Sequence, residues 1–263
     1  MFKINDFISG KLIKADPEEI EAVQPFSKIL VEDYNYPKEF ITTRPQYRVS
    51  IRPSDSKKSY PVDIAIFNSK DKRDEDLFII VECKQKNRKD GIKQLQKYLT
   101  FSDAELGVWF NGNERLFYQK YESKGKVYFK EIPNIPKFGE KINEIGLHKR
   151  KDLKKTHNLI QVFKTIRNYL AGNAVNTTRD EQFAREIINI ILTKLYDEKF
   201  TKPEDIVNFR AGINENSKEI SDRIKARFNE TKKIYKDVLD DNDIIELDEK
   251  SITYIVGELQ NYC

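Results

Sequence analysis

The segment of residues 77–84, Leu-Phe-Ile-Ile-Val-Glu-Cys-Lys, constrains the fold of this chain more than any other. Its stretch 78–81 is continuously apolar, which is typical of a central strand that is buried on both faces. Successive side chains of a strand point to opposite faces, so Glu82 and Lys84 share one face and Cys83 points away. Charged side chains at the end of a buried strand are costly unless they are paired or bind a metal ion. The segment therefore predicts a central strand that ends in a polar site.

A second apolar stretch, residues 60–67, carries the acidic residue Asp63. If its strand pairs beside that of Glu82, two carboxylates and the Lys84 ammonium group converge at one end of a sheet. Oxygen ligands of this kind suit Mg²⁺, which proteins hold through one or two carboxylates plus substrate phosphates. We therefore predict a Mg²⁺ site, which Mn²⁺ could also occupy. A second interpretation stays open, in which Glu82 and Lys84 are the solvated face of an edge strand.

The composition limits the compartment and the class of protein. The 263 residues are 34% charged with a net charge of +4, and no run of about 18 apolar residues could span a membrane. The N-terminal segment lacks the apolar core of a signal peptide. Two cysteines, Cys83 and Cys263, are too few for a disulfide framework, and no Cys/His metal cluster is present. These features predict a cytoplasmic protein whose nucleic-acid contacts, if any, come from local basic clusters.

The pattern of apolar residues changes near residue 135, from alternating strand and helix patterns to helical spacing alone. We therefore expect two domains, an α/β domain over residues 1–135 and a helical connector over residues 136–263. The first is predicted to hold a helix that restarts after Pro25 over 26–33, a strand at 40–51 with an irregularity at Pro45, a polar turn at 53–58, a helix at 90–101, a strand at 106–110, and a hairpin of 116–121 with 126–132. The second is predicted to hold helices at 181–196, 218–239 and 251–263.

The last predicted helix keeps its apolar stripe up to the end of the chain. The stripe consists of Ile252, Ile255, Val256, Leu259 and Tyr262, and no closing glycine, basic last turn or polar tail follows it. We therefore expect the stripe to be an exposed face that needs a partner, and the chain to be a piece of a longer polypeptide.

Four short motifs follow one another in the α/β domain. They are Pro61-Val62-Asp63, Glu82-Cys83-Lys84, a Gln94-x-x-x-Tyr98 signature on the next helix, and the strand-to-turn sequence Gly-Val-Trp-Phe-Asn-Gly at 107–112. In this order they resemble the PD-(D/E)xK nucleases, with one residue inserted between the proline and the aspartate. Over residues 15–133 the series is similar to the N-terminal nuclease domain of type I restriction enzyme R subunits and of single-chain restriction–modification enzymes.

The resemblance implies a restriction-endonuclease-like α/β core, with a central mixed sheet flanked by helices, followed here by an all-α region. It also implies that Asp63 and Glu82 hold the divalent metal ion and that Lys84 orients or helps to activate the attacking water. The main-chain carbonyl of Cys83 is a natural third metal ligand. The chemistry agrees, because a metal ion lowers the pKa of a bound water and a lysine near two acids keeps its charge.

Further residues are implicated by the same resemblance. Gln94 and Tyr98 lie one helical turn apart, and the family uses this pair to support the active site or to contact DNA. The alternative is that Tyr98 packs in the core while Gln94 is solvated. Related nucleases also carry an acidic residue on the first helix, for which Glu21 is the better match here and Glu32 the second, although Pro25 interrupts that helix.

A basic strip runs from the end of the central strand into the next helix, where it could neutralise DNA phosphates or be a solvated helix face. It consists of Lys84, Lys86, Arg88, Lys89, Lys93 and Lys97, of which Lys86 and Lys93 are candidate substrate contacts. In the helical region, residues 180–198 resemble the helical lead-in to N6-adenine DNA methyltransferases. No AdoMet-binding glycine motif and no ATP-binding glycine loop is present in the sequence.

These patterns predict a Mg²⁺-dependent endonuclease domain that hydrolyses phosphodiester bonds of double-stranded DNA within a restriction–modification enzyme. The expected partners are DNA and the methyltransferase and target-recognition domains or subunits of the same system, with no membrane. Two alternatives stay open, a non-catalytic nuclease-like module that binds DNA or a subunit, and a repair or recombination nuclease. The complete set of Asp63, Glu82 and Lys84 favours catalysis.

Overall fold

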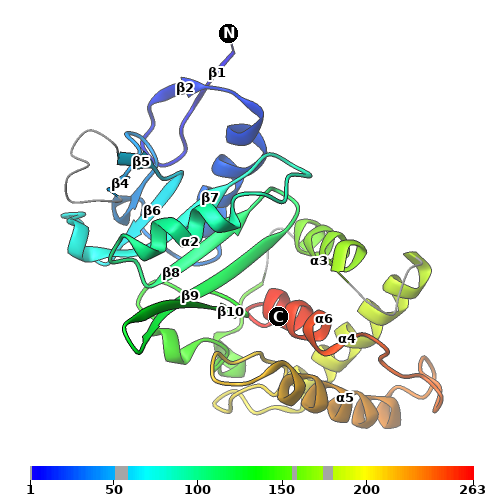
Figure 1. Ribbon diagram of the computed structural model, residues 1–263. Helices are drawn as coiled ribbons and strands as arrows, with labels where there is room; N and C mark the ends of the chain where they lie inside the picture. The colour runs from blue at the N-terminus through cyan, green and yellow to red at the C-terminus, as the bar shows by residue number, and fades with distance from the viewer. Residues whose placement is uncertain (1, 51–58, 156–158, 174–179) are drawn as a thin grey trace. The chain divides into compact units, whose positions relative to one another are not determined.

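The structure is a computed structural model that describes residues 2–50, 59–155, 159–173 and 180–263 (Figure 1). Its internal contacts divide the chain into two compact units, residues 1–139 and 140–263. This division lies close to residue 135, where the sequence pattern changes. The polar turn predicted at residues 53–58 lies outside the described residues.

The first unit is built on a six-stranded mixed sheet in the order β10-β9-β8-β7-β6-β3. The neighbours β7 and β8 run parallel, and the other neighbours pair antiparallel. The strands are β3 (Ile41–Thr42), β6 (Ile64–Phe67), β7 (Leu77–Cys83), β8 (Leu106–Phe110), β9 (Arg115–Ser123) and β10 (Lys126–Ile132). Two small sheets accompany it, β1 (Lys3–Asn5) with β2 (Leu12–Lys14), and β4 (Arg48–Ser50) with β5 (Ser59–Pro61).

Helices cover both faces of this sheet. They are α1 (Gln24–Glu32) and α2 (Ile92–Thr100). Leu95 of α2 shares a core cluster with Trp109 of β8, whereas Phe26 of α1 packs against Phe110 with ring centroids 5.0 Å apart. Consecutive residues of a strand point to opposite faces, so α1 and α2 lie on opposite sides of the sheet. The interior strand β7 is buried along its whole length, as predicted. The mixed sheet with flanking helices is thus confirmed, and its nuclease-like character stays a prediction.

Three sequence predictions for this unit differ from the structure. The helix predicted to restart over 26–33 is present as α1, but Pro25 causes no break before it, because a wide π-turn (Glu19–Val23) leads directly into α1, where Pro25 lies in the first turn. The N–H of Gln24 bonds to the carbonyl of the first residue of that π-turn, and a proline is tolerated where a new helical turn begins. The strand predicted at 40–51 is split into β3 and β4, which belong to different sheets. Pro45 lies between them and has no N–H to continue a ladder. The stretch 60–67, predicted as one strand, is likewise split into β5 and β6 of different sheets, with Asp63 in the bend between them.

The helix predicted at 90–101, the strand at 106–110 and the hairpin at 116–132 are confirmed as α2, β8 and β9–β10. In the hairpin, Ser123 pairs with Lys126, which leaves a two-residue turn of Lys124 and Gly125. Both turn residues have positive φ, 51° and 71°, which is the backbone that suits the twist of a tight hairpin.

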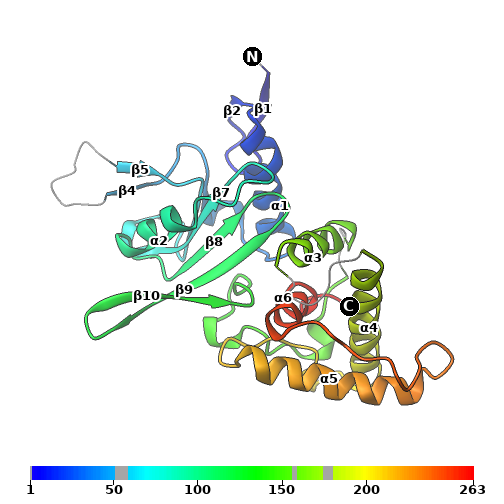
Figure 2. The ribbon, with the colours of Figure 1, turned by 45° about the vertical axis from the view of Figure 1, so that its right-hand side comes forward.

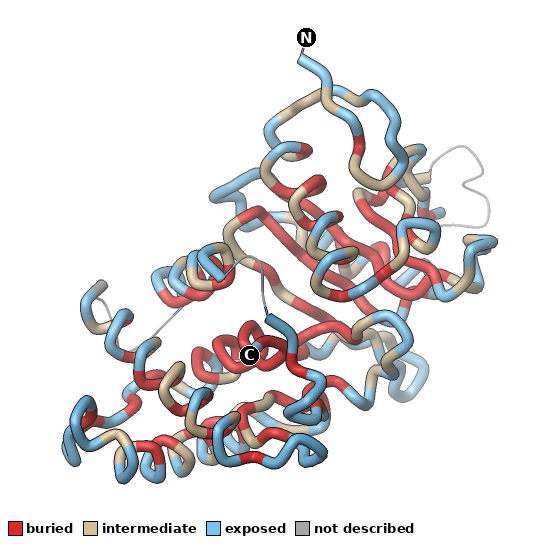
Figure 3. The backbone as a smooth tube through the Cα atoms, turned by 180° about the vertical axis from the view of Figure 1, so that it is seen from behind, coloured by how far each residue is buried: buried red, intermediate tan, exposed pale blue. Residues whose placement is uncertain are grey.

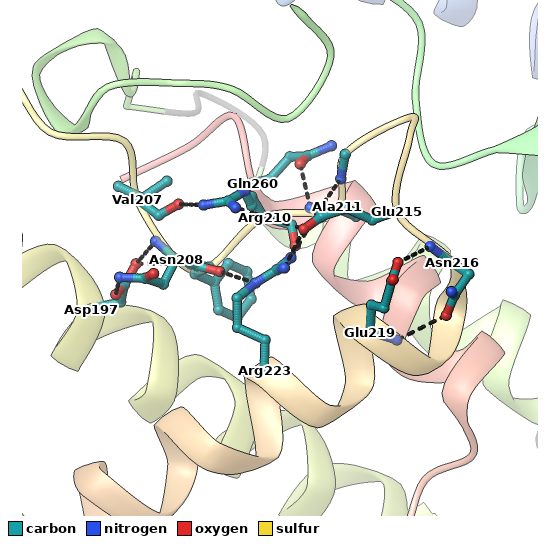
Figure 4. Close-up of polar contacts among 12 residues, drawn as sticks. Asp197, Val207, Asn208, Arg210, Ala211, Glu215, Asn216, Glu219, Arg223 and Gln260 are labelled. Carbon is teal, nitrogen blue, oxygen red and sulfur yellow. Dashed lines mark hydrogen bonds and ion pairs between the residues drawn. The ribbon is translucent and has the colours of Figure 1, made fainter. Parts of the chain in front are cut away.

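The second unit is helical. Its helices are α3 (Leu159–Asn173), α4 (Asp180–Phe200), α5 (Ser217–Ile234) and α6 (Glu249–Leu259). The last three confirm the predicted helices, although α5 and α6 end before the predicted residues 239 and 263, and α3 has no predicted counterpart. A capping box starts α5, in which Asn216 and Glu219 each accept a hydrogen bond from the other's backbone N–H (Figure 4). Among the described residues, no helix is long and apolar enough to cross a membrane.

Helix α6 is buried at the centre of this unit, which corrects the exposed face predicted for it. Ile252, Ile255 and Val256 are fully buried, and Leu259 and Tyr262 are nearly so. Figure 3 shows the helix as a buried segment next to the C-terminus. The helix packs against α3 and α5. An apolar stripe indicates that a partner exists without identifying it, and here the partners are helices of the same unit.

A polar network holds the segment between α4 and α5 (Figure 4). Asp197 is fully buried, and its carboxylate accepts hydrogen bonds from the backbone N–H groups of Asn208 (2.7 Å) and Phe209 (2.8 Å). The guanidinium group of Arg227 donates to the same carboxylate at 2.9 Å. Arg223 adds a hydrogen bond to the carbonyl oxygen of Asn208 at 3.0 Å. The buried charge is therefore matched by a cation and by several donors.

Candidate active site

The antiparallel pairing of β6 with β7 places the predicted polar residues at one end of the sheet. Ile64 pairs with Val81, so Asp63, which precedes β6, lies beside the end of β7. The Oδ2 atom of Asp63 accepts a hydrogen bond from the backbone N–H of Cys83 at 2.8 Å. The negative charge of Asp63 also acts on the carboxyl group of Glu82. The two predicted carboxylates are thus neighbours, as expected if their strands pair.

Glu82 and Lys84 lie on the same face and contact each other directly. The Nζ atom of Lys84 donates to Oε1 of Glu82, and the two residues are only 8% and 1% exposed. This burial contradicts the interpretation of a solvated edge strand. Within the described part of the chain, Oε2 of Glu82 is buried with no hydrogen-bond partner. An unpaired buried acceptor is costly, so a ligand that satisfies it would be bound favourably.

The electrostatics of this cluster, Asp63, Glu82 and Lys84, favour an added cation. Burial raises the pKa of Asp63 to about 6, although the hydrogen bond from the Cys83 N–H acts to lower it. Burial, followed by the charge of Asp63, raises the pKa of Glu82 to about 7. Burial alone would lower the pKa of Lys84, but its hydrogen bond to Glu82 and the two carboxylate charges raise it. A cation beside the two acids would therefore favour their ionised forms.

Glu18 is the acidic residue of the first helix whose charge reaches the cluster, where it adds to the raised pKa values of both carboxyl groups. Sequence reasoning favoured Glu21 instead. The carboxylate of Glu21 accepts a hydrogen bond from the backbone N–H of Lys86 at 3.0 Å, so it holds the loop after β7. A cap is the signal that could have pointed to Glu18. Asp16 accepts from the N–H of Glu19 at 3.0 Å, which fixes the first turn of this helix.

The donors of the cluster fit a hard divalent cation that takes further ligands from water and substrate. Among the described residues, no group of three or more His, Cys, Asp or Glu side chains could hold a metal ion. Asp63 and Glu82 provide two carboxylates, one with an unpaired oxygen. Burial raises the pKa of the Cys83 thiol, so this residue could act as a ligand only through its carbonyl oxygen. Mg²⁺ suits such a set, because it keeps several waters and binds through few carboxylates.

A glycine lets helix α2 begin directly against the cluster. Gly91 has a φ of 102°, and a Cβ atom there would lie 2.7 Å from Cε of Lys84 and 3.4 Å from Cγ of Glu82. Farther along the helix, Nε2 of Gln94 donates to the hydroxyl group of Tyr98 at 2.7 Å. Burial raises the pKa of Tyr98, and the charges of the two carboxyl groups add to this effect. The predicted pair therefore lies together near the cluster, and its contact with substrate stays a prediction.

The turn after β8 anchors the loop between β7 and α2. The indole N–H of Trp109 donates to the carbonyl of Asp90 at 2.8 Å, and the side-chain amide of Asn111 donates to the carbonyl of Arg88 at 2.9 Å. Gly112 follows with a φ of 79°, and a Cβ atom there would lie 2.4 Å from a backbone oxygen of the π-turn. Only glycine permits this close approach. The motif at 107–112 thus connects three parts of the site.

Residues 17–136 match a family model described as the type I restriction enzyme R protein N terminus. The resemblance of this segment to the N-terminal domain of type I restriction enzyme R subunits is confirmed, and its likeness to the PD-(D/E)xK nucleases stays a prediction. The match spans less than half of the chain and lies within the first unit, where it includes Glu18 and the whole Asp63, Glu82 and Lys84 cluster. A comparison with curated proteins finds no match. The likeness of residues 180–198 to a methyltransferase lead-in stays a prediction.

Not every residue of the basic strip in this R-protein-like segment lies on the surface. Lys84 is buried in the cluster, and the other members are exposed. Arg88 pairs with Asp90 at 2.5 Å. Lys86 and Lys93 are exposed on the loop and helix that follow β7, where they stay candidates for phosphate contacts.

Proposed function

We propose that the first unit is a Mg²⁺-dependent endonuclease module of a restriction system and that it hydrolyses phosphodiester bonds of double-stranded DNA. One observation carries the proposal: two neighbouring carboxylates, one with an unpaired buried oxygen, lie beside a buried lysine. The match to the R protein N terminus of type I restriction enzymes supports the choice of DNA as substrate. It also supports methyltransferase and target-recognition domains or subunits as partners.

The residues of the cluster would have different roles in the reaction. Asp63, Glu82 and the Cys83 carbonyl would hold the ion. A bound Mg²⁺ supplies a water of lowered pKa and neutralises charge on the phosphate. Lys84 stays protonated, because Glu82 and Asp63 raise its pKa, and its ammonium group can donate to a phosphate oxygen as negative charge develops. Glu82 holds that ammonium group in position through Oε1.

Residues around the cluster would bind and orient the DNA. Gln94 is exposed, and its hydrogen bond to Tyr98 fixes the direction of its amide. Lys86 and Lys93, which are both exposed, would neutralise DNA phosphates. Glu18 would strengthen the attraction for the cation through its charge.

Cleavage of supercoiled plasmid by the full chain tests the proposal. We expect Mg²⁺ and Mn²⁺ to support cutting, EDTA to stop it, and Asp63→Asn to abolish it, because the substitution removes a metal ligand without adding bulk. Asp71→Asn, which changes an exposed aspartate of the same unit, is the matched control and should cut as the wild type does. Equal cutting by Asp63→Asn and the wild type would overturn the assignment. DNA binding without any cutting would support the non-catalytic module, and cutting confined to branched or single-stranded DNA would support the repair nuclease.

A further inference from the structure

The hairpin of β9 and β10 runs past the end of β8 as a two-stranded ribbon (Figure 2). Leu106, the first residue of β8, pairs with Gln119, so the part of the hairpin beyond Gln119 has no β8 partner. The register pairs Gln119 with Lys130, Tyr121 with Tyr128, and Ser123 with Lys126. These six side chains lie on one side of the ribbon, because alternate residues of a strand share a face. We call them the ribbon face.

The opposite side of the ribbon is occupied by its own unit. Lys120 donates to the carbonyl oxygens of Leu99 (3.2 Å) and Ser102 (2.7 Å) at the end of α2. Phe129, which pairs with Lys120, packs against the core beneath α2. The ribbon face therefore points away from α2. Glu82, in contrast, is in register with Trp109, on the α2 side of the sheet, so the ribbon face and the catalytic cluster lie on different faces.

Two tyrosines dominate the ribbon face. The rings of Tyr121 and Tyr128 are stacked, with centroids 5.5 Å apart and an angle of 21° between their planes. They nevertheless stay 46% and 42% exposed. Stabilisation of the hairpin explains why the two rings contact each other across the strands. It does not explain why the outer surfaces of the rings stay exposed to water.

Positive charge flanks the tyrosine pair. Lys126 lies on one side and Lys130 on the other, both exposed, and none of the six residues of the ribbon face is acidic. Lysines on either side of exposed aromatic rings match the chemistry of a single nucleic-acid strand. Its bases stack on the rings and its phosphates pair with the ammonium groups. A duplex would leave the rings without a partner, since its bases are already stacked on one another.

We propose that the ribbon face binds single-stranded DNA, with bases stacked on Tyr121 and Tyr128 and phosphates neutralised by Lys126 and Lys130. This site is separate from the cluster of Asp63, and it does not depend on cleavage. It shares with the proposed function only the choice of DNA rather than RNA.

Fluorescence anisotropy with a labelled thymidine oligomer tests this site. The full chain is used in EDTA, so that cutting plays no part. The double variant Tyr121→Thr with Tyr128→Thr removes both rings, and threonine favours the strand conformation, so the hairpin should still form. This variant should bind the oligomer at least about tenfold more weakly, as expected for the loss of base stacking. Lys126→Gln should lower the slope of log affinity against log salt by about 0.7, the value for one lost phosphate contact to a single strand.

Matched controls lie elsewhere on the first unit. Phe2→Thr removes an exposed aromatic ring, and Lys14→Gln removes an exposed lysine; both should bind the oligomer as the wild type does. Unchanged binding by the double tyrosine variant, or no binding by the wild type, would overturn the proposal. It would also be overturned if a duplex bound as tightly and was sensitive to the lysines alone, or if a uridine oligomer bound more tightly. Failure of plasmid cleavage would leave the result of this experiment unchanged.

Discussion

Each unit of this chain buries a carboxylate, Asp197 in the second unit and Glu82 in the first, and the two differ in how many hydrogen bonds they receive. In the second unit, Asp197 is fully buried and receives hydrogen bonds from two backbone N–H groups and from Arg227. In the first unit, Glu82 is almost as deeply buried, but Lys84 is the one hydrogen-bond partner of its carboxylate in the described structure, and one carboxylate oxygen is unpaired. Asp63 adds a second negative charge beside it.

By this difference, Asp197 is a structural carboxylate, whereas the carboxylate of Glu82 is available to a ligand. A buried charge with all of its donors in place stabilises the segment that supplies them, as Asp197 does between α4 and α5. A buried charge that lacks donors and faces a like charge is kept at a cost to folding, and such sites are concentrated where proteins bind ions or perform chemistry. Substitutions at the two sites should therefore change the stability of the fold in opposite directions: loss of the Asp197 carboxylate should lower it, and loss of the Asp63 charge should raise it.

The largest effect is expected at the satisfied site. Asp197→Ala leaves two backbone N–H groups and the Arg227 guanidinium without their acceptor. The free energy of unfolding should fall by about 3–5 kcal/mol, measured by urea denaturation. Asp237→Ala, at an exposed position after α5, is the control and should change it by less than about 0.5 kcal/mol. Similar stability of the two variants would show that the Asp197 network is not structural.

Lys84→Ala should lower the rate of Mg²⁺-dependent plasmid cutting by about 10²–10³-fold, comparable to the loss of one transition-state donor. DNA affinity should change little, because Lys84 is directed at Glu82 and not at the surface. Lys86→Ala alters an exposed lysine of the adjacent loop and should instead affect affinity. A loss of affinity in Lys84→Ala as large as its loss of rate would make Lys84 a simple phosphate contact.

Gly91→Ala should impair both folding and cutting. An alanine at a φ of 102° is strained, and its Cβ atom would displace the side chain of Lys84. Gly125→Ala is the matched control, because Gly125 also has positive φ but a Cβ atom there would meet nothing within 4 Å. Both variants should lose about 1–2 kcal/mol of stability from backbone strain, and Gly91→Ala alone should lose activity. Equal activity of the two would show that α2 does not position Lys84.

The smallest effect is a gain in stability from Asp63→Asn in the absence of metal. The pKa of Asp63 is raised to about 6 in the folded state, so folding favours its protonated form. This contribution is fully present below the unfolded pKa of about 4, and it is lost as the pH rises through about 6. Asp63→Asn should therefore melt roughly 2–4 °C above the wild type at pH 7, with no gain near pH 4. A melting temperature of Asp63→Asn below that of the wild type at pH 7 would show that the buried charge of Asp63 does not destabilise the fold.

The parts of this fold that follow from local pattern were predictable. The continuous apolar run before Glu82 identifies β7, because such a run needs burial on both faces. Once β6 pairs antiparallel with β7, the proximity of Asp63 and Glu82 follows from register alone. The hairpin of β9 and β10 follows from two strand patterns around a short turn containing Gly125.

Other features depend on contacts between distant residues. The Asp16 cap marks the start of the first helix in the sequence, but the effect of the Glu18 charge on the cluster emerges only from the packed structure. The helix continues through Pro25 because a π-turn precedes it, and a proline alone suggests a break. The stripe on α6 is visible in the sequence, but α3 and α5 as its partners are not. The unpaired oxygen of Glu82 likewise emerges only from the packed structure.

Calorimetric titration with Mn²⁺ and with Mg²⁺ tests the central claim most directly, namely that the two neighbouring carboxylates of the first unit, Asp63 and Glu82, form a metal site. The wild type should bind one ion, more tightly at pH 8 than at pH 6, because protons compete for carboxyl groups whose pKa values are raised to about 6 and about 7. Asp63→Asn should weaken binding at least about tenfold, and Asp71→Asn should not. Binding of the same affinity in Asp63→Asn and the wild type would contradict the account.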